Sequence, residues 1–308
     1  MTLARRFLIF VTFLGTLPFA ATAQNAAITP EAAITADPAP DKTNPALIDT
    51  FQLPSHGALL NALVYVASGP GPHPTVVLLH GFPGNEKNLD LAQAIRRAGW
   101  NVLYFDYRGS WGSPGDFSFT HCIEDTASAI AWLRVPANAT KERVDAKRIV
   151  LVGHSMGGFM AIEAGARDAG IEAVITISGA DMGMTQVLAA PAAQRAAFVP
   201  QIAPQLAAEG MAPLAGTSAQ ALAKELVENA PEWSFPALGA QLATRPLLVI
   251  TSDDGWQTPG EALVAAVQKA GGQRASTVHM ATDHSYSDHR IALEEAVVGA
   301  LLKQPAGE

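Results

Sequence analysis

The chain has 308 residues, of which 49% are hydrophobic and 16% charged, so it is long and apolar enough to bury a large core. Acidic residues outnumber basic ones by 28 to 20, and the formal net charge of -8 argues against nucleic acid as a partner. Cys122 is the single cysteine, which excludes an intramolecular disulfide.

The first 23 residues are typical of an export signal. Arg5 and Arg6 precede an apolar stretch over residues 7–20, and Ala21-Thr22-Ala23 offers a peptidase a site of small residues. We therefore expect cleavage after Ala23 and a periplasmic or secreted protein without stable membrane insertion. A membrane anchor is the alternative, although the apolar stretch is short for a bilayer. Residues 24–46 have no apolar period, which predicts a flexible leader.

From Leu47 onward, apolar strands alternate with helical segments, which predicts one α/β domain over residues 47–302. The strands lack polar alternation, as expected for a mostly parallel, twisted sheet covered by helices on both faces. A hairpin is expected at 47–53 and 58–66, and helices at 88–98, 121–134 and 157–168. The other strands are expected at 75–80, 100–107, 148–153, 173–178, 247–251 and 276–280.

Residues 180–245 interrupt this alternation, because they are rich in Ala, Pro and Gln and carry few β-branched runs. We expect a helical insertion that forms a lid, with one helix from about 217 to 228. Its apolar residues could line a pocket or simply fill gaps in the packing, and these are Met182, Met184, Phe198 and Met211. After the insertion, Thr258-Pro259-Gly260-Glu261 predicts a capping box with proline in the first turn of a helix.

The segment Arg148–Gly158, RIVLVGHSMGG, is the most informative in the chain. An apolar strand runs directly into Gly-His-Ser-Met-Gly, and small residues follow in a predicted helix. In this pattern the serine occupies a strained turn between strand and helix, and glycine is required where a side chain would collide with the backbone. The pattern predicts an exposed nucleophile at Ser155.

Two further segments complete a resemblance. His80-Gly81-Phe82-Pro83-Gly84 follows a predicted strand, and Asp106-Tyr107-Arg108-Gly109 follows the next one. Together with the serine turn, they make residues 47–302 resemble the α/β-hydrolase family, in the branch of serine aminopeptidases, monoacylglycerol lipases and dienelactone hydrolases. The resemblance implies the α/β-hydrolase fold and a catalytic triad in the order Ser, Asp, His.

The resemblance also assigns the remaining site residues. The acid should follow the strand at 247–251, which points to Asp254, with Asp253 as the alternative. The base should follow the last strand, which points to His284. The backbone amides of Phe82 and Met156 are expected to form the oxyanion hole. This chemistry needs neither a cofactor nor a metal ion.

Other histidines and the cysteine have competing interpretations. His279 and His289 fall within a predicted strand and a predicted helix, where packing or solvation is expected. His154 lies inside the serine turn and is expected to be packed or hydrogen bonded. A metal cluster is a weaker alternative because no tight ligand spacing is shared, and its candidates are His279, Asp283, His284, Asp288 and His289. Cys122 opens an amphipathic helix, which favours a structural role over a catalytic thiol.

These observations predict an exported serine hydrolase that cleaves a carboxylic ester through an acyl-enzyme. Its partner would be a small-molecule ester or amide substrate. A peptidase or aminopeptidase and an acyltransferase stay open as alternatives on the same fold, and a non-catalytic binding protein is the alternative from another class. Acyl chain length and oligomeric state stay open as well.

Overall fold

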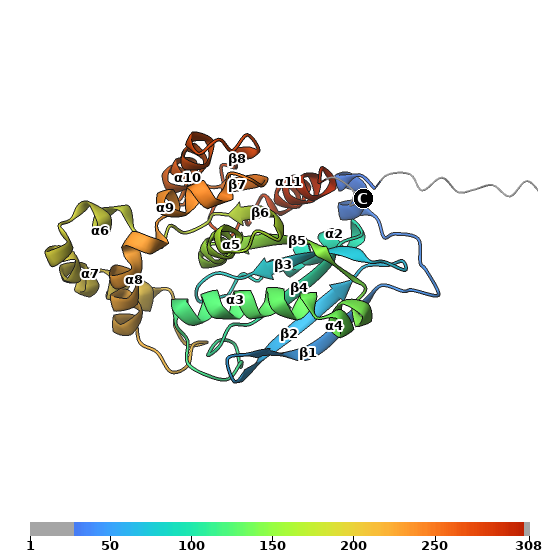
Figure 1. Ribbon diagram of the computed structural model, residues 1–308, viewed down its shortest axis with the longest axis horizontal. Helices are drawn as coiled ribbons and strands as arrows, with labels where there is room; N and C mark the ends of the chain where they lie inside the picture. Colours follow the sequence, from blue (N-terminus) through green and yellow to red (C-terminus); the bar gives the residue numbers. More distant parts are fainter. Residues whose placement is uncertain (1–27, 305–308) are drawn as a thin grey trace, which may run out of the picture.

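One sheet of eight strands runs through the computed structural model, which describes residues 28–304 (Figure 1). The strand order is β1-β2-β4-β3-β5-β6-β7-β8. The first two strands form an antiparallel hairpin, β2 is antiparallel to β4, and the other neighbours are parallel. The strands are β1 (Leu47–Ser55), β2 (Ala58–Val66), β3 (His73–Leu79), β4 (Asn101–Phe105), β5 (Val144–His154), β6 (Ile171–Ile177), β7 (Leu247–Thr251) and β8 (Ala275–His279).

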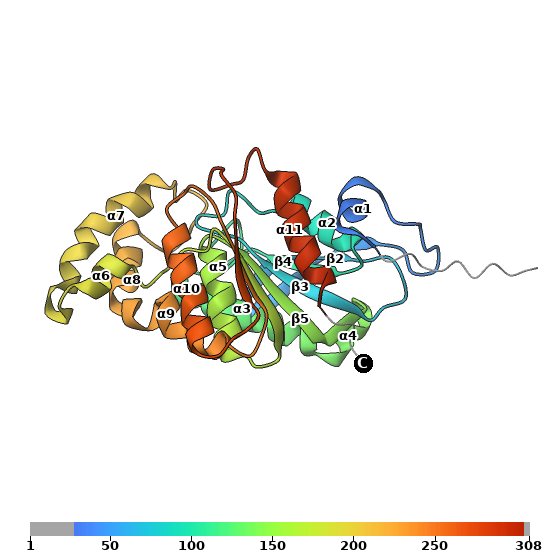
Figure 2. The same ribbon diagram turned by 90° about the horizontal axis from the view of Figure 1, so that it is seen from above.

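Helices cover both faces of the sheet, as Figure 2 shows. Alternate residues of a strand point to opposite faces, so Val76 and Val150 pack with α2 (Leu89–Arg97) and α11 (Arg290–Leu302). Val77 and Leu151 belong to the core on the other face. That face carries α3 (Phe119–Arg134), α5 (Met156–Arg167) and α10 (Gln257–Lys269), and the short α4 (Pro136–Lys141) follows α3. The predicted α/β class, with its mostly parallel sheet and helices on both faces, is confirmed.

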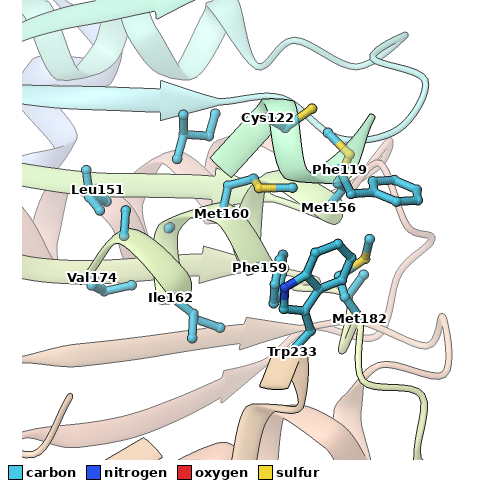
Figure 3. Packing of buried hydrophobic residues seen from close by; sticks show 14 of the residues in the cluster. Phe119, Cys122, Leu151, Met156, Phe159, Met160, Ile162, Val174, Met182 and Trp233 are labelled. Atoms are coloured by element: carbon cyan, nitrogen blue, oxygen red, sulfur yellow. The ribbon is translucent and has the colours of Figure 1, made fainter. Parts of the chain in front are cut away.

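The insertion between β6 and β7 is helical and lies at one end of the sheet in both views (Figures 1 and 2). It is anchored to the body through Trp233, whose ring centroid lies 5.6 Å from that of Phe159 in α5. Figure 3 shows this packing, with Met182 beside the tryptophan. The helices of the insertion are α6 (Thr185–Ala189), η1 (Ala192–Phe198), α7 (Val199–Ala208), α8 (Ala219–Trp233), α9 (Phe235–Leu238) and η2 (Gly239–Leu242).

The N-terminal region differs from the expectation of a flexible leader. Residues Pro30–Thr35 form α1, with the Thr29 hydroxyl accepting a hydrogen bond from the Ala32 amide at 3.2 Å. Ala33 is only 2% exposed, and its carbonyl accepts a hydrogen bond from Arg97 of α2. Burial of one small face against the body therefore orders a segment that has no apolar period. The predicted signal over residues 1–23 lies outside the described residues.

Two helix starts also differ from the sequence expectations. Helix α10 begins at Gln257 rather than Pro259, and Thr258 makes no capping bond. The Trp256 amide instead donates to Asp254 Oδ1 at 2.9 Å, which turns the chain into the helix earlier than a capping box would. His289 lies at the N-cap of α11 rather than within it. Among residues 28–304, no helix has the length and apolar character needed to cross a membrane.

Candidate active site

Ser155 lies at the turn between β5 and α5. Its backbone adopts φ 56° and ψ -122°, outside the usual regions for a residue with a side chain. The Ser155 amide donates to the Ile177 carbonyl at 2.9 Å, and its carbonyl accepts hydrogen bonds from Gly158 and Ala180. These contacts to α5 and to the end of β6 hold the strained turn in place.

The two glycines of the turn are required by close backbone contacts. A Cβ atom at Gly153 would lie 2.0 Å from the Gly157 carbonyl oxygen, and a Cβ at Gly157 would lie 2.1 Å from the Leu79 carbonyl oxygen. Neither contact could be relieved by a side-chain rotation, because both involve backbone atoms. The reason that the sequence suggested for these glycines is therefore confirmed.

Ser155 faces a cavity of about 440 Å³ between the carboxyl ends of the strands and the insertion. His284 and Asp254 line the same cavity, so the structure brings together three residues that are up to 129 positions apart in the chain. Most of the remaining wall is apolar or aromatic, and its residues are Phe82, Phe119, Met156, Ala180, Met182, Met184, Ile202, Leu206, Leu226 and Trp256. The polar wall residues are Asp181, Gln205 and Glu209.

Asp254 and His284 form a hydrogen-bonded pair. His284 Nδ1 lies 2.7 Å from Asp254 Oδ2, and the carboxylate side chain is 6% exposed against 38% for the imidazole. Burial would raise the pKa of Asp254, but hydrogen bonds, chiefly that from His284, hold this pKa well below its ordinary value. The carboxylate is therefore ionised and fixes His284 with Nδ1 as the donor. Asp253 points elsewhere, with Oδ1 3.2 Å from His279 Nε2.

A buried group of hydroxyls lies behind this pair, and the sequence analysis did not find it. Ser178 Oγ lies 2.9 Å from Ser252 Oγ and 3.0 Å from the Tyr286 hydroxyl, and all three residues are buried. Burial raises the pKa of Tyr286 to about 12, so the phenol stays protonated. No sequence signal links these residues, because they come from three segments that meet only in the fold.

His154 supports the backbone of His284. Its Nε2 donates to the His284 carbonyl oxygen at 2.8 Å, and the two rings lie 4.8 Å apart. Burial lowers the pKa of His154 to about 3, so the ring is neutral at physiological pH. The expectation of a packed, hydrogen-bonded role is confirmed.

Phe82 and Met156 belong to the two segments that adjoin Ser155. A Cβ at Gly81, the residue before Phe82, would lie 2.9 Å from Ser155 Cβ, and Met156 is the first residue of α5. Amides in the first turn of a helix have no acceptor within it. Among the described residues, neither the Phe82 nor the Met156 amide donates a hydrogen bond. Both amides are therefore free to bind an oxyanion.

The other candidates lie apart from this pairing. Cys122 is fully buried in the core, and burial raises the pKa of its thiol well above the ordinary value, so it is a packing residue. His279 Nδ1 pairs with Thr251, and His289 Nδ1 pairs with Asp288 at 2.8 Å. Within residues 28–304, no group of three or more His, Cys, Asp or Glu side chains is placed to hold a metal ion.

Comparison with known proteins identifies the family of the chain. Residues 76–298 match the model of the alpha/beta hydrolase family. The chain belongs to that family. An uncharacterized 31.7 kDa protein from the traX-finO intergenic region of Escherichia coli is 34% identical over 116 residues, which span 36% of this chain and 39% of that protein. Lysophosphatidylserine lipase ABHD12 of Danio rerio is 29% identical over 96 residues, spanning 30% of this chain and 23% of the lipase. The alignments thus cover less than half of these relatives.

Solved structures share the fold over more than 80% of this chain. A thermostable carboxyl esterase from Bacillus coagulans superposes with a TM-score of 0.63 at 15% identity, covering 83% of this chain and 98% of the esterase. Est1E from Butyrivibrio proteoclasticus, solved with ferulic acid, gives 0.59 at 22% identity, with coverages of 82% and 98%. The acylaminoacyl peptidase of Pyrococcus horikoshii gives 0.63 at 17% identity and covers 85% of this chain but 43% of the peptidase. The chain is thus a member of the alpha/beta hydrolase family, and its fold is shared by solved esterases and by a solved peptidase.

Proposed function

We propose that this hydrolase cleaves carboxylic esters through an acyl-enzyme formed on Ser155. The observation that carries the proposal is the shared cavity, in which Ser155 stands on a strained turn and His284 is held by the ionised Asp254. A serine hydroxyl needs both a base and a group that orients the base, and this arrangement supplies them.

Each residue has a defined role in the proposed reaction. Ser155 Oγ attacks the ester carbonyl carbon while His284 Nε2 accepts its proton, and the amides of Phe82 and Met156 stabilise the oxyanion. Collapse of the tetrahedral intermediate breaks the ester bond, and His284 returns the proton to the leaving alcohol. Water, deprotonated by His284, then attacks the acyl carbonyl carbon. Collapse of this second tetrahedral intermediate breaks the bond between Ser155 Oγ and the acyl carbon, His284 returns the proton to Ser155 Oγ, and the acid is released. Asp254 stabilises the imidazolium that forms twice in this cycle.

The wall of the cavity favours esters as substrates. Its aromatic and aliphatic side chains suit an acyl chain. Solved structures with this fold include a carboxyl esterase and an acylaminoacyl peptidase, so both bond types belong in the test. If an alcohol attacked the acyl-enzyme in place of water, the same protein would act as an acyltransferase.

A matched set of 4-nitrophenyl esters and 4-nitroanilides tests the proposal, with short and long acyl groups and an aminoacyl group. We expect the purified protein to cleave the esters faster than the corresponding anilides, and Ser155→Ala to lose activity on both. Faster cleavage of the aminoacyl anilides would favour a peptidase. Full ester hydrolysis by Ser155→Ala would contradict the proposed nucleophile.

We also propose that the protein is exported, on the strength of the sequence of residues 1–23. Expression of the full chain in a Gram-negative host, followed by fractionation and N-terminal sequencing, should find a periplasmic protein beginning at Gln24. Recovery in the cytoplasm with residues 1–23 intact would contradict export.

A further inference from the structure

Asp181 is a buried carboxylate on the wall of the cavity that contains Ser155. It lies shortly after β6, one residue beyond Ala180, whose amide donates to the Ser155 carbonyl. Asp181 is 4% exposed, and its Oδ1 accepts hydrogen bonds from the Phe235 amide at 3.0 Å and from the Gly183 amide at 3.2 Å. The side chain is therefore fixed in place between the end of β6 and the start of α9.

The structural contacts of Asp181 do not use its charge. Both amides bind Oδ1, and the amide oxygen of an asparagine could accept the same two bonds. Among residues 28–304, Oδ2 accepts no hydrogen bond and no basic side chain forms a salt bridge with Asp181. Burial raises the pKa of Asp181, because nothing but these amides offsets the loss of water. An ionised carboxylate in such a place is costly unless a ligand supplies the opposite charge.

The other charged and aromatic residues of the cavity wall also favour a cationic ligand. Apart from the paired His284 and Asp254, its charged wall residues are Asp181 and Glu209, and within residues 28–304 no lysine or arginine contributes to the wall. The aromatic rings of Phe82, Phe119 and Trp256 also line it, and such faces attract cations. A negatively charged substrate would therefore be repelled, whereas a cation would find one fixed carboxylate and several aromatic rings.

We propose that Asp181 is a specificity residue that binds a cationic nitrogen of the substrate, so that the preferred substrates are esters with an ammonium group in the acyl or the alcohol part. The inference rests on the proposed ester hydrolysis at Ser155 and names the substrate class of that same site. Asp181 contributes no step to bond cleavage, and its carboxylate acts through charge alone.

Two isosteric pairs of esters test this inference, since each pair differs only in replacing a quaternary carbon by a quaternary nitrogen. The first pair is methyl 4-trimethylammoniobutanoate with methyl 5,5-dimethylhexanoate, and the second is choline butyrate with 3,3-dimethylbutyl butyrate. Acid release is followed by pH-stat, and each kcat/KM is divided by the rate constant for hydroxide-catalysed hydrolysis. We expect the cationic ester to be preferred by about tenfold in at least one pair, the size of one good buried charge contact.

The variant Asp181→Asn keeps the two bonds to Oδ1 and removes the charge, so the preference for the cationic ester should fall at least about fivefold. Glu228→Gln is the control, because Glu228 is an exposed carboxylate of α8 that lies outside the wall of this cavity, and its charge is screened by water; it should alter the preference by less than about twofold. Labelling by a fluorophosphonate probe verifies that Ser155 stays reactive in both variants.

The wild-type comparison alone can overturn the inference, whether or not a variant folds. A preference below about threefold in both pairs, at hydrolysis rates well above background, would refute the role of Asp181 and leave ester hydrolysis standing. A preference that survives Asp181→Asn unchanged would refute it as well. Absence of hydrolysis of all four esters by the wild type, together with no labelling of Ser155, would instead refute the proposed function.

Discussion

At the scale of single residues, the pairing of Asp254 with His284 decides which of two adjacent acids serves the site. We predict that Asp254→Asn lowers kcat by about 10⁴-fold, because an asparagine amide at this place favours the wrong imidazole tautomer and cannot stabilise the imidazolium. Steady-state kinetics with a 4-nitrophenyl ester measures the loss.

Asp253→Asn is the matched control, since this neighbour is exposed and faces His279. It should leave kcat within about twofold of the wild type, as expected for a surface substitution. Equal losses in the two variants would mean that the segment, rather than the carboxylate at 254, matters.

Residues differ in how well the sequence predicts them. Ser155 was predictable because the strand, the two glycines and the helix that define its turn are adjacent in the chain. Asp254 and Asp253 stayed alternatives because the choice depends on which of the two carboxylates contacts His284. That contact forms only where residues 281–286 pack beside the end of β7, far along the chain. The hydroxyls of Ser178 and Tyr286 gave no signal, since they meet only where β6, β7 and the last loop come together. Asp181 gave none either, because its partner Phe235 lies 54 residues away at the start of α9.

At the scale of elements, the insertion is tied to the body at the start of α3. Glu225 of α8 accepts hydrogen bonds from the Phe119 amide at 3.0 Å and the Thr120 amide at 2.7 Å, and a carboxylate there also suits the helix dipole. We predict that Glu225→Ala lowers the free energy of unfolding by about 1–2 kcal/mol. The variant should also raise KM, because Phe119 forms part of the cavity wall. Urea denaturation and ester kinetics measure the two effects.

Glu228 on the same helix provides the comparison. Glu228 is exposed, and its Oε1 lies 3.6 Å from Lys224 Nζ. Glu228→Ala should therefore lower the free energy of unfolding by no more than about 0.5 kcal/mol and leave KM unchanged. If both variants behaved alike, Glu225 would be a surface charge without a role in holding the insertion. The sequence predicted a helix in this region, but not its docking on α3, because the insertion has no repeated pattern that indicates its partner.

At the scale of the whole molecule, buried histidines make stability depend on pH. Burial lowers the pKa of His80 to about 4 and that of His154 to about 3, whereas an unfolded histidine titrates near 6.5. Between these values the unfolded chain binds more protons than the folded one, so the free energy of unfolding falls as the pH falls. We expect a loss of about 2 kcal/mol per histidine between pH 7.5 and pH 5, measured by urea denaturation.

Two asparagine variants isolate this effect. His80→Asn keeps a donor for the Gly81 carbonyl, which His80 Nδ1 binds at 2.8 Å, and should reduce the pH dependence by about half. His56→Asn replaces an exposed histidine at φ 44°, a conformation that asparagine tolerates. This variant should leave the pH dependence of the free energy of unfolding unchanged. Stability that is flat or rises on acidification would contradict the burial of neutral imidazoles.

Labelling with a fluorophosphonate probe is the most direct measurement of the central claim, that Ser155 is an activated nucleophile. The probe bonds covalently to a serine made reactive by a neighbouring base, whether or not the natural substrate is known. Peptide mass spectrometry of the labelled wild type should place the adduct on Ser155, and Ser155→Ala should take up no label. An adduct on another residue, or undiminished labelling of Ser155→Ala, would contradict the account.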